Sequence, residues 1–105
     1  MTSIAEELQQ RLQGEVHFDR FTRALYSTDA SIYREEPLGV VMPRDEEEVA
    51  ATVALAARER VPLLPRGAGT SLAGQTVGRA LVLDLSRHMD RILEINPEER
   101  WARVQ

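Results

Sequence analysis

The sequence predicts an α+β domain with a small, mostly parallel sheet, flanking helices and a C-terminal β-hairpin. Short apolar runs at residues 38–42 and 62–64 read as strands, and the first of them has the composition of a buried strand. Between them lies a helical pattern long enough for a right-handed crossover between parallel strands. Near the end of the chain, two further strand patterns flank the turn at residues 96–99, as in a hairpin.

Composition limits the classes of function. The 105 residues are 43% hydrophobic and 29% charged, which is typical of one small globular domain. A net charge of −4 disfavours nucleic acid as a partner. The chain has no cysteine, and no apolar run reaches the roughly 20 residues of a membrane span. Its acidic, polar N-terminus is unlike a signal peptide. We therefore expect a cytoplasmic protein with no membrane span.

The first element is a helix over residues 3–12. Ser3 and Glu6 form a capping box at its start. Gly14 is expected to end it. One face carries an apolar stripe: Ile4, Leu8 and Leu12.

Residues 16–33 have a mixed pattern. Asp19 is a candidate cap of a short helix, and Asp29 with Ser31 indicates a turn or another cap. We expect Tyr33 to pack, although a place near a cofactor is the alternative. The expected apolar anchors are Phe18, Phe21, Leu25 and Tyr26.

The second long helix begins at Asp45, with Glu48 at the capping-box position. The glutamates at 46–48 favour the positive end of the helix dipole, and we expect them to form a solvated first turn rather than a metal site. The expected core face is Val49, Val53, Ala56 and Ala57.

The remaining strands are expected at residues 62–64, 81–85, 92–95 and 100–105. We expect Trp101 to pack rather than bind a ligand. His17 and His88 are isolated in the sequence, so a metal site is disfavoured at either of them.

The functional signal is the glycine-rich stretch PRGAGTSLAGQ at residues 65–75. It follows a strand of the predicted parallel sheet, at the edge where such sheets bind ligands. Glycine leaves backbone N–H groups accessible and permits positive φ, and serine and threonine hydroxyls add donors. The stretch therefore predicts a phosphate or pyrophosphate site, with an ordinary surface turn as the alternative.

Neither familiar nucleotide motif fits fully. In the dinucleotide pattern G-x-G-x-x-G, Leu72 takes the place of the last glycine. In the triphosphate loop G-x-x-x-x-G-K-[ST], Gln75 takes the place of the lysine.

The stretch resembles the pyrophosphate loop of the FAD-linked oxidases of the vanillyl-alcohol oxidase / p-cresol methylhydroxylase (PCMH) superfamily. The similarity extends to YSTDASIY at residues 26–33, PLGVVMP at 37–43 and LVLDLS at 81–86. Within this superfamily the chain looks most like the 2-hydroxyacid dehydrogenases, which act on glycolate, D-lactate or D-2-hydroxyglutarate. Some of these proteins carry an iron–sulfur region.

The resemblance implies the first subdomain of a PCMH-type FAD-binding domain. Residues 1–17 would be a lead-in helix, and residues 18–105 the first part of the FAD domain, truncated at its C-terminus because complete members are several times longer. Arg66 would add positive charge or form a structural salt bridge. The implied cofactor-binding residues are Pro65, Arg66, Gly67, Ala68, Gly69, Thr70, Ser71, Gly74 and Gln75.

The resemblance also implies the chemistry. Superfamily members that bind FAD covalently through a loop histidine have that histidine where this chain has Thr70, so we expect non-covalent FAD. The expected substrate of the complete protein is a small 2-hydroxy acid, and its electron acceptor is not indicated. No residue here looks catalytic, and any iron–sulfur cluster would lie outside this chain. The alternatives are a phosphate- or nucleotide-binding module without redox activity, and a structural or interaction fragment.

Overall fold

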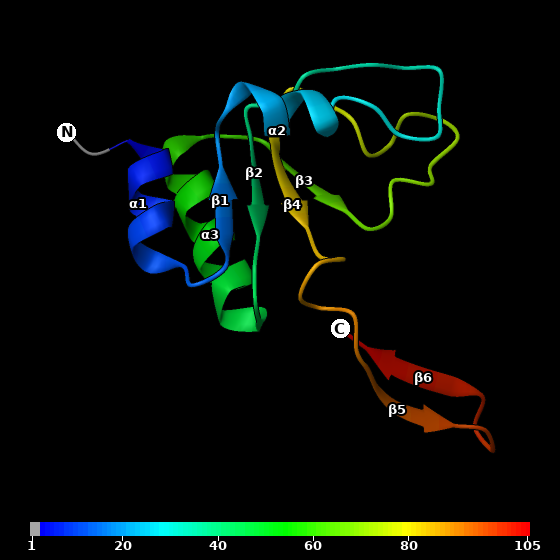
Figure 1. Cartoon of the computed structure of the whole chain (residues 1–105). Helices are drawn as coiled ribbons and strands as arrows, with labels where there is room; N and C mark the ends of the chain where they lie inside the picture. Colours follow the sequence, from blue (N-terminus) through cyan, green and yellow to red (C-terminus); the bar gives the residue numbers. More distant parts are fainter. Residues whose placement is uncertain (1–2) are drawn as a thin grey trace.

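The computed structural model describes residues 3–105. Figure 1 shows helices beside a small sheet and a separate hairpin near the C-terminus. In chain order the elements are α1 (Ile4–Arg11), β1 (Glu15–His17), α2 (Arg20–Leu25), β2 (Gly39–Met42), α3 (Glu46–Glu59), β3 (Leu63–Arg66), β4 (Leu81–Asp84), β5 (Ile92–Asn96) and β6 (Trp101–Val104).

The main sheet has four strands in the order β1-β2-β4-β3. The β2–β4 and β3–β4 pairs are parallel, whereas β1 runs antiparallel to β2. The parallel β2 and β3 are connected through α3, as the crossover pattern predicted. The α+β fold with a mostly parallel sheet and a C-terminal hairpin is therefore confirmed.

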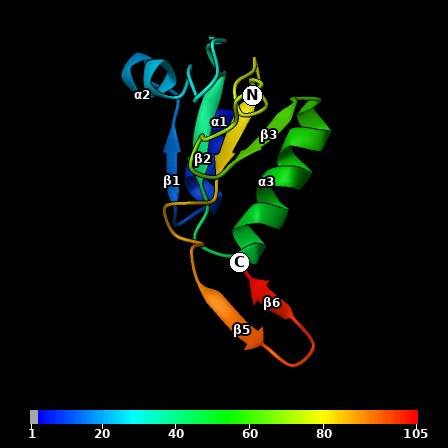
Figure 2. The same cartoon turned by 90° about the vertical axis from the view of Figure 1, so that its right-hand side faces the viewer.

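The main core lies between the sheet and the helices α1 and α3, which pack against each other on one side of it (Figures 1 and 2). Every residue of β2 and β4 is buried, as expected for strands covered on both faces. On the opposite face, Val40, Met42 and Val82 pack with Tyr26 and Leu64. The buried residues of the main core are Leu8, Leu12, Val41, Leu55, Leu81 and Leu83.

The start of α1 is as predicted, but its end is not. Ser3 caps the helix by accepting a hydrogen bond from the Glu6 N–H at 3.2 Å. The helix ends at Arg11, and Leu12 already has an extended backbone. Gly14 is required for another reason, because a Cβ at this position would lie 2.2 Å from the Met42 carbonyl oxygen. The prediction that Gly14 terminates the helix was therefore wrong.

Two expectations for α3 need correction. Asp45 caps the helix, with its carboxylate accepting from the Glu48 N–H at 2.9 Å. Val53, however, is 46% exposed and Ala57 is also exposed, because the buried stripe is rotated from the expected one. The stripe includes Thr52, whose hydroxyl donates to the Glu48 carbonyl at 2.7 Å. The buried residues of α3 are Glu48, Thr52, Leu55 and Ala56.

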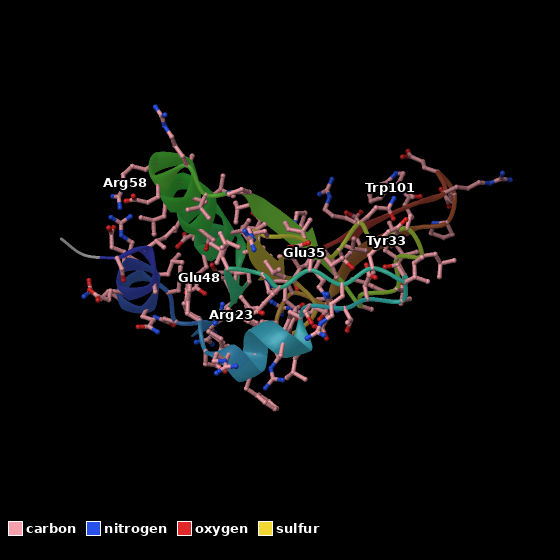
Figure 3. The ribbon with its side chains drawn as sticks, turned by 90° about the horizontal axis from the view of Figure 1, so that it is seen from above. Arg23, Tyr33, Glu35, Glu48, Arg58 and Trp101 are labelled. Atoms are coloured by element: carbon pink, nitrogen blue, oxygen red, sulfur yellow. The ribbon has the colours of Figure 1, made fainter. Side chains whose placement is uncertain are left out.

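Glu48 is the larger surprise, since only Glu46 and Glu47 of the three glutamates are solvated. The Glu48 carboxylate is buried and accepts from the backbone N–H groups of Gln13 at 2.5 Å, Gly14 at 3.1 Å and Arg44 at 2.9 Å. Figure 3 shows it where α3 approaches the connection between α1 and β1. It therefore joins the N-terminal segment to the sheet layer.

The region before β2 is more regular and less buried than the sequence indicated. Residues 15–17 form the edge strand β1, which was not predicted. Asp19 does cap α2, accepting from the Thr22 N–H at 2.9 Å. Phe21 and Leu25 are 74% and 58% exposed and anchor nothing among the described residues, so that expectation was wrong.

The hairpin β5–β6 extends away from the sheet in both views (Figures 1 and 2). Trp101 makes contacts within it: its indole N–H donates to Glu99 at 2.8 Å, and Arg103 lies over its ring at 5.7 Å. The other large apolar side chains of the hairpin are exposed: Ile92, Leu93, Ile95 and Val104.

Candidate functional site

The glycine-rich stretch is divided between a strand and a loop. β3 runs to Arg66, two residues beyond the predicted end at Leu64, so Pro65 and Arg66 belong to the sheet. The loop leaves β3 at Gly67, at the end of the sheet where parallel β4 also ends. This is the edge at which α/β proteins place ligands.

The loop leaves its backbone donors free. From residue 68 to residue 74, none of the backbone N–H groups has a hydrogen-bond acceptor within residues 3–105. The next two N–H groups are paired, those of Gln75 with the Ser71 hydroxyl at 3.2 Å and of Thr76 with Asp29. A run of free backbone donors is the arrangement from which anion-binding concavities are built.

Two of the loop glycines are required by backbone geometry. Gly69 and Gly74 have φ values of 71° and 78°, which other residues rarely adopt. A Cβ on Gly69 would also lie 2.6 Å from Arg66 Nη2. Gly67 differs, because a Cβ there would meet no atom within 4 Å. The chain therefore turns at Gly69 and Gly74, whereas neither backbone geometry nor a described neighbour requires glycine at position 67.

The hydroxyl groups of the loop are not equivalent. The Ser71 hydroxyl is occupied inside the loop, donating to the side-chain oxygen of Gln75 and accepting from its N–H. Thr70 is exposed, and its hydroxyl has no hydrogen-bond partner in the described part of the chain. Thr70 is therefore better placed than Ser71 to add a side-chain donor for a ligand.

Of the two roles expected for Arg66 from the sequence, the structural salt bridge is absent among the described residues, and the added positive charge for a phosphate stays a prediction. The Arg66 guanidinium donates to the carbonyl oxygens of Thr28 at 2.8 Å, Thr76 at 3.2 Å and Tyr26 at 3.4 Å, and forms no salt bridge with the described carboxylates. It also lies 5.1 Å from the centre of the Tyr26 ring, within the range of a cation–π interaction. Arg66 therefore holds the glycine-rich loop against residues 26–28.

Tyr26 connects this arrangement to the core. Its hydroxyl donates to the carboxylate of the buried Asp84 at 2.5 Å. Burial, together with this hydrogen bond, raises the pKa of Tyr26 well above its ordinary value of 10.0. Asp84 also accepts from Ser86 N–H at 2.9 Å. The phenol therefore stays neutral and keeps its hydrogen bond at physiological pH.

Asp29 joins the same two segments from the other side. One carboxylate oxygen accepts from the Ser31 N–H at 2.9 Å, which confirms the predicted turn. The other accepts from the Thr76 hydroxyl at 2.8 Å. Sequence reasoning missed this contact, since it spans 47 residues.

Asp29 should titrate far below an ordinary aspartate. The Ser31 hydroxyl is the main cause, with further hydrogen bonds from Thr76, and these donors lower the pKa of Asp29 from 3.8 to about 2. Because the folded-state pKa is depressed, the carboxylate stabilises the fold fully above the unfolded pKa and loses this contribution as pH falls toward about 2. Carboxyl-carbon NMR titration should show this low midpoint, and a midpoint near 3.8 would contradict the described contacts.

An open cavity of about 830 Å³ lies beside the loop, lined by Tyr33, Arg34, Gly74 and Arg79 among others. Tyr33, which was expected to pack, is 57% exposed and lies against the loop rather than in the core. Its ring covers Gly74, where a Cβ would lie 2.7 Å from Tyr33 Cδ2. Figure 3 shows Tyr33 at the end of the molecule opposite α1. The surface beside the free N–H groups is therefore both hollow and partly aromatic.

The remaining candidates add no second site. His17 and His88, isolated in the sequence, both contact Glu15, at 3.4 Å and 3.1 Å. Among residues 3–105 no cluster of histidine and acidic side chains could hold a metal ion. None of the helices in the same range is long and apolar enough to cross a membrane.

Comparisons with known proteins give one family and several longer relatives. The sequence profile described as "FAD binding domain" matches residues 37–105. The chain is 46% identical over 105 residues to D-2-hydroxyglutarate dehydrogenase of Escherichia coli strain K12, covering 97% of this chain and 10% of that protein. It is 39% identical over 107 residues to glycolate oxidase subunit GlcD of Bacillus subtilis strain 168, covering 97% of this chain and 22% of that subunit. The chain thus spans only a small part of these relatives.

Solved structures support the same fold at lower identity. Alkyldihydroxyacetonephosphate synthase superposes with a TM-score of 0.78 at 23% identity, over 97% of this chain and 23% of that one. BBE-like 1 of Physcomitrella patens superposes with a TM-score of 0.71 at 20% identity, over 92% of this chain and 21% of that one. With the sequence profile matching from Pro37 to the last residue, this chain belongs to the FAD-binding domain family.

Proposed function

We propose that this chain is the FAD-binding portion of a flavin-dependent oxidoreductase and that its loop at residues 67–75 binds the FAD pyrophosphate. The free backbone N–H groups of residues 68–74 are the observation that carries the proposal. They form a run of free donors of the kind that would suit a doubly charged pyrophosphate. Because the chain belongs to the FAD-binding domain family, we assign the bound pyrophosphate to FAD.

The residues divide into direct and indirect roles. Gly67, Ala68, Gly69, Thr70 and Ser71 would contact the phosphates mainly through their backbones, and Thr70 adds a free hydroxyl. Gly74 and Gln75 would close the far side of the loop, with Gln75 holding Ser71. Pro65 and Arg66 would have an indirect role. They lie in β3, and the Arg66 guanidinium already donates to carbonyl oxygens of Thr76 and Thr28.

The lead-in segment is built into the same unit as the proposed binding domain. We assign residues 1–17 to the lead-in and residues 18–105 to the first part of the FAD domain. Leu8 of α1 packs in the main core, and β1 pairs with β2. The lead-in would therefore support the sheet that carries the loop, rather than act as a separate domain.

For the complete protein we propose oxidation of a small 2-hydroxy acid. This follows the activities for which the relatives are named, D-2-hydroxyglutarate dehydrogenase and glycolate oxidase. FAD would supply the acceptor for a hydride from the hydroxyl-bearing carbon. The residues of this chain would bind and orient the cofactor, and none is assigned as the catalytic base. The cytoplasmic location, and the placement of any iron–sulfur cluster outside this chain, stay predictions.

The mode of FAD attachment has a direct test. Thr70 cannot form the covalent bond that a loop histidine can form, so we expect FAD to be released when the protein unfolds. The protein from the complete reading frame should show a visible flavin band that moves to the supernatant after acid precipitation. Flavin retained in the pellet would contradict non-covalent binding. A colourless protein that takes up no added FAD would overturn the flavin function and leave a phosphate-binding module of another kind.

A further inference from the structure

Two loops that are distant in the sequence form one hydrogen-bonded unit. The Ala30 N–H donates to the Gly69 carbonyl at 2.9 Å, and the Thr76 hydroxyl donates to Asp29 at 2.8 Å. These bonds hold the glycine-rich loop near both of its turns, since Gly69 and Gly74 have positive φ. In Figure 1 the two loops (cyan and yellow-green) extend together from the same end of the sheet.

The contact at Gly69 determines where the next donor points. The described chain has no cis peptide bonds, so each peptide C=O and the following N–H point in opposite directions. With the Gly69 carbonyl directed at the Ala30 N–H, the Thr70 N–H of the same peptide must point away from Ala30. The segment that accepts the carbonyl thus sets the direction of a donor in the proposed phosphate site.

Asp29 holds that segment in place through both of its carboxylate oxygens. One of its oxygens accepts from the Ser31 N–H at 2.9 Å and fixes the turn that contains Ala30. The other accepts from the Thr76 hydroxyl at 2.8 Å and from the Thr76 N–H at 3.4 Å. A carboxylate suits this place because both of its oxygens only accept.

We propose that Asp29 is a positioning residue for the phosphate-binding loop, acting through Thr76 and through the Ala30–Gly69 hydrogen bond. Asp29 does not bind the cofactor, since its two oxygens are already occupied and its negative charge would repel phosphate. The inference rests on the proposed binding of FAD by this loop. It goes further by assigning the shape of the site to a residue outside the glycine-rich stretch.

The test uses FAD affinity, measured by flavin fluorescence on apoprotein from the complete reading frame. Asp29→Asn places an amide where two sets of donors converge, so one set must lose its acceptor. We expect about a tenfold or larger rise in Kd, since hydrogen bonds to charged groups are strong. Thr76→Val should weaken binding similarly, whereas Thr76→Ser, which keeps the hydroxyl, should retain it. In the double variant Asp29→Asn/Thr76→Val the two effects should not add.

The matched control is Asp19→Asn. Asp19 accepts from the N–H and hydroxyl of Thr22, both at 2.9 Å, so it makes the same kind of contact away from the loop. Its variant should lose stability without losing FAD affinity. Equal Kd values for Asp29→Asn and Asp19→Asn, or additive effects in the double variant, would overturn the positioning role. If the unaltered protein binds no FAD, the proposed function itself fails, which is a separate and recognisable outcome.

Discussion

Glu48→Ala should destabilise the fold by about 3 kcal/mol, enough to lower Tm by more than about 10 °C. The buried carboxylate accepts from the N–H groups of Gln13, Gly14 and Arg44. Alanine would leave these part-buried donors without their charged acceptor, and each lost hydrogen bond to the carboxylate costs free energy. Urea unfolding followed by circular dichroism gives the change in the free energy of unfolding.

The neighbouring Glu47→Ala is the control for that loss. Glu47 lies in the same first turn of α3 but is exposed, so its variant changes the charge near the helix terminus without removing a buried acceptor. We expect a change within about 0.5 kcal/mol. Equal stabilities of the two variants would show that the Glu48 hydrogen bonds contribute nothing beyond the charge.

Gly69→Val should weaken FAD binding by about a hundredfold or more. Gly69 has a φ of 71°, which a β-branched residue avoids, and a Cβ would lie 2.6 Å from Arg66 Nη2. The loop would have to abandon its turn or displace the arginine that holds it. The measurement is the Kd for FAD of reconstituted apoprotein, with circular dichroism to verify that the variant is folded.

Gly67→Ala is the matched control within the same loop. A Cβ at Gly67 meets no protein atom within 4 Å, and its φ is not positive, so alanine should fit the folded loop and change the free energy of unfolding by no more than about 0.5 kcal/mol. A folded Gly69→Val variant that binds FAD like the unaltered protein would separate the loop conformation from binding. In that case the phosphate would have to bind elsewhere.

The sequence predicted the elements whose signals are local. Ser3, Asp19 and Asp45 each cap a helix as expected, because a cap needs only the three residues that follow it. The two buried strands were recognisable from their continuous apolar runs. The position of the loop followed from the order of these elements, together with its glycines.

The features that were missed depend on partners distant in the chain. β1 has only three residues, and it is recognisable as a strand only from its pairing with β2. Glu48 looked solvated because two of its partners lie 34 and 35 residues away. The role of Arg66 was equally hidden, since backbone carbonyl groups carry no sequence signature. Phe21 and Leu25 were misjudged because the short α2 buries none of its residues.

The hairpin that projects from the sheet divides the molecule into two cooperative units. Its strands pair with each other, and its open end is closed by the Gln105 N–H donating to the Arg91 carbonyl at 3.0 Å. A two-stranded hairpin without a packed face is only marginally stable in water, so its amide protons should exchange through local opening. The buried amides of β2 and β4 should exchange only when the helix-covered sheet unfolds. A single thermal midpoint for this chain therefore describes the sheet and its helices, not the hairpin.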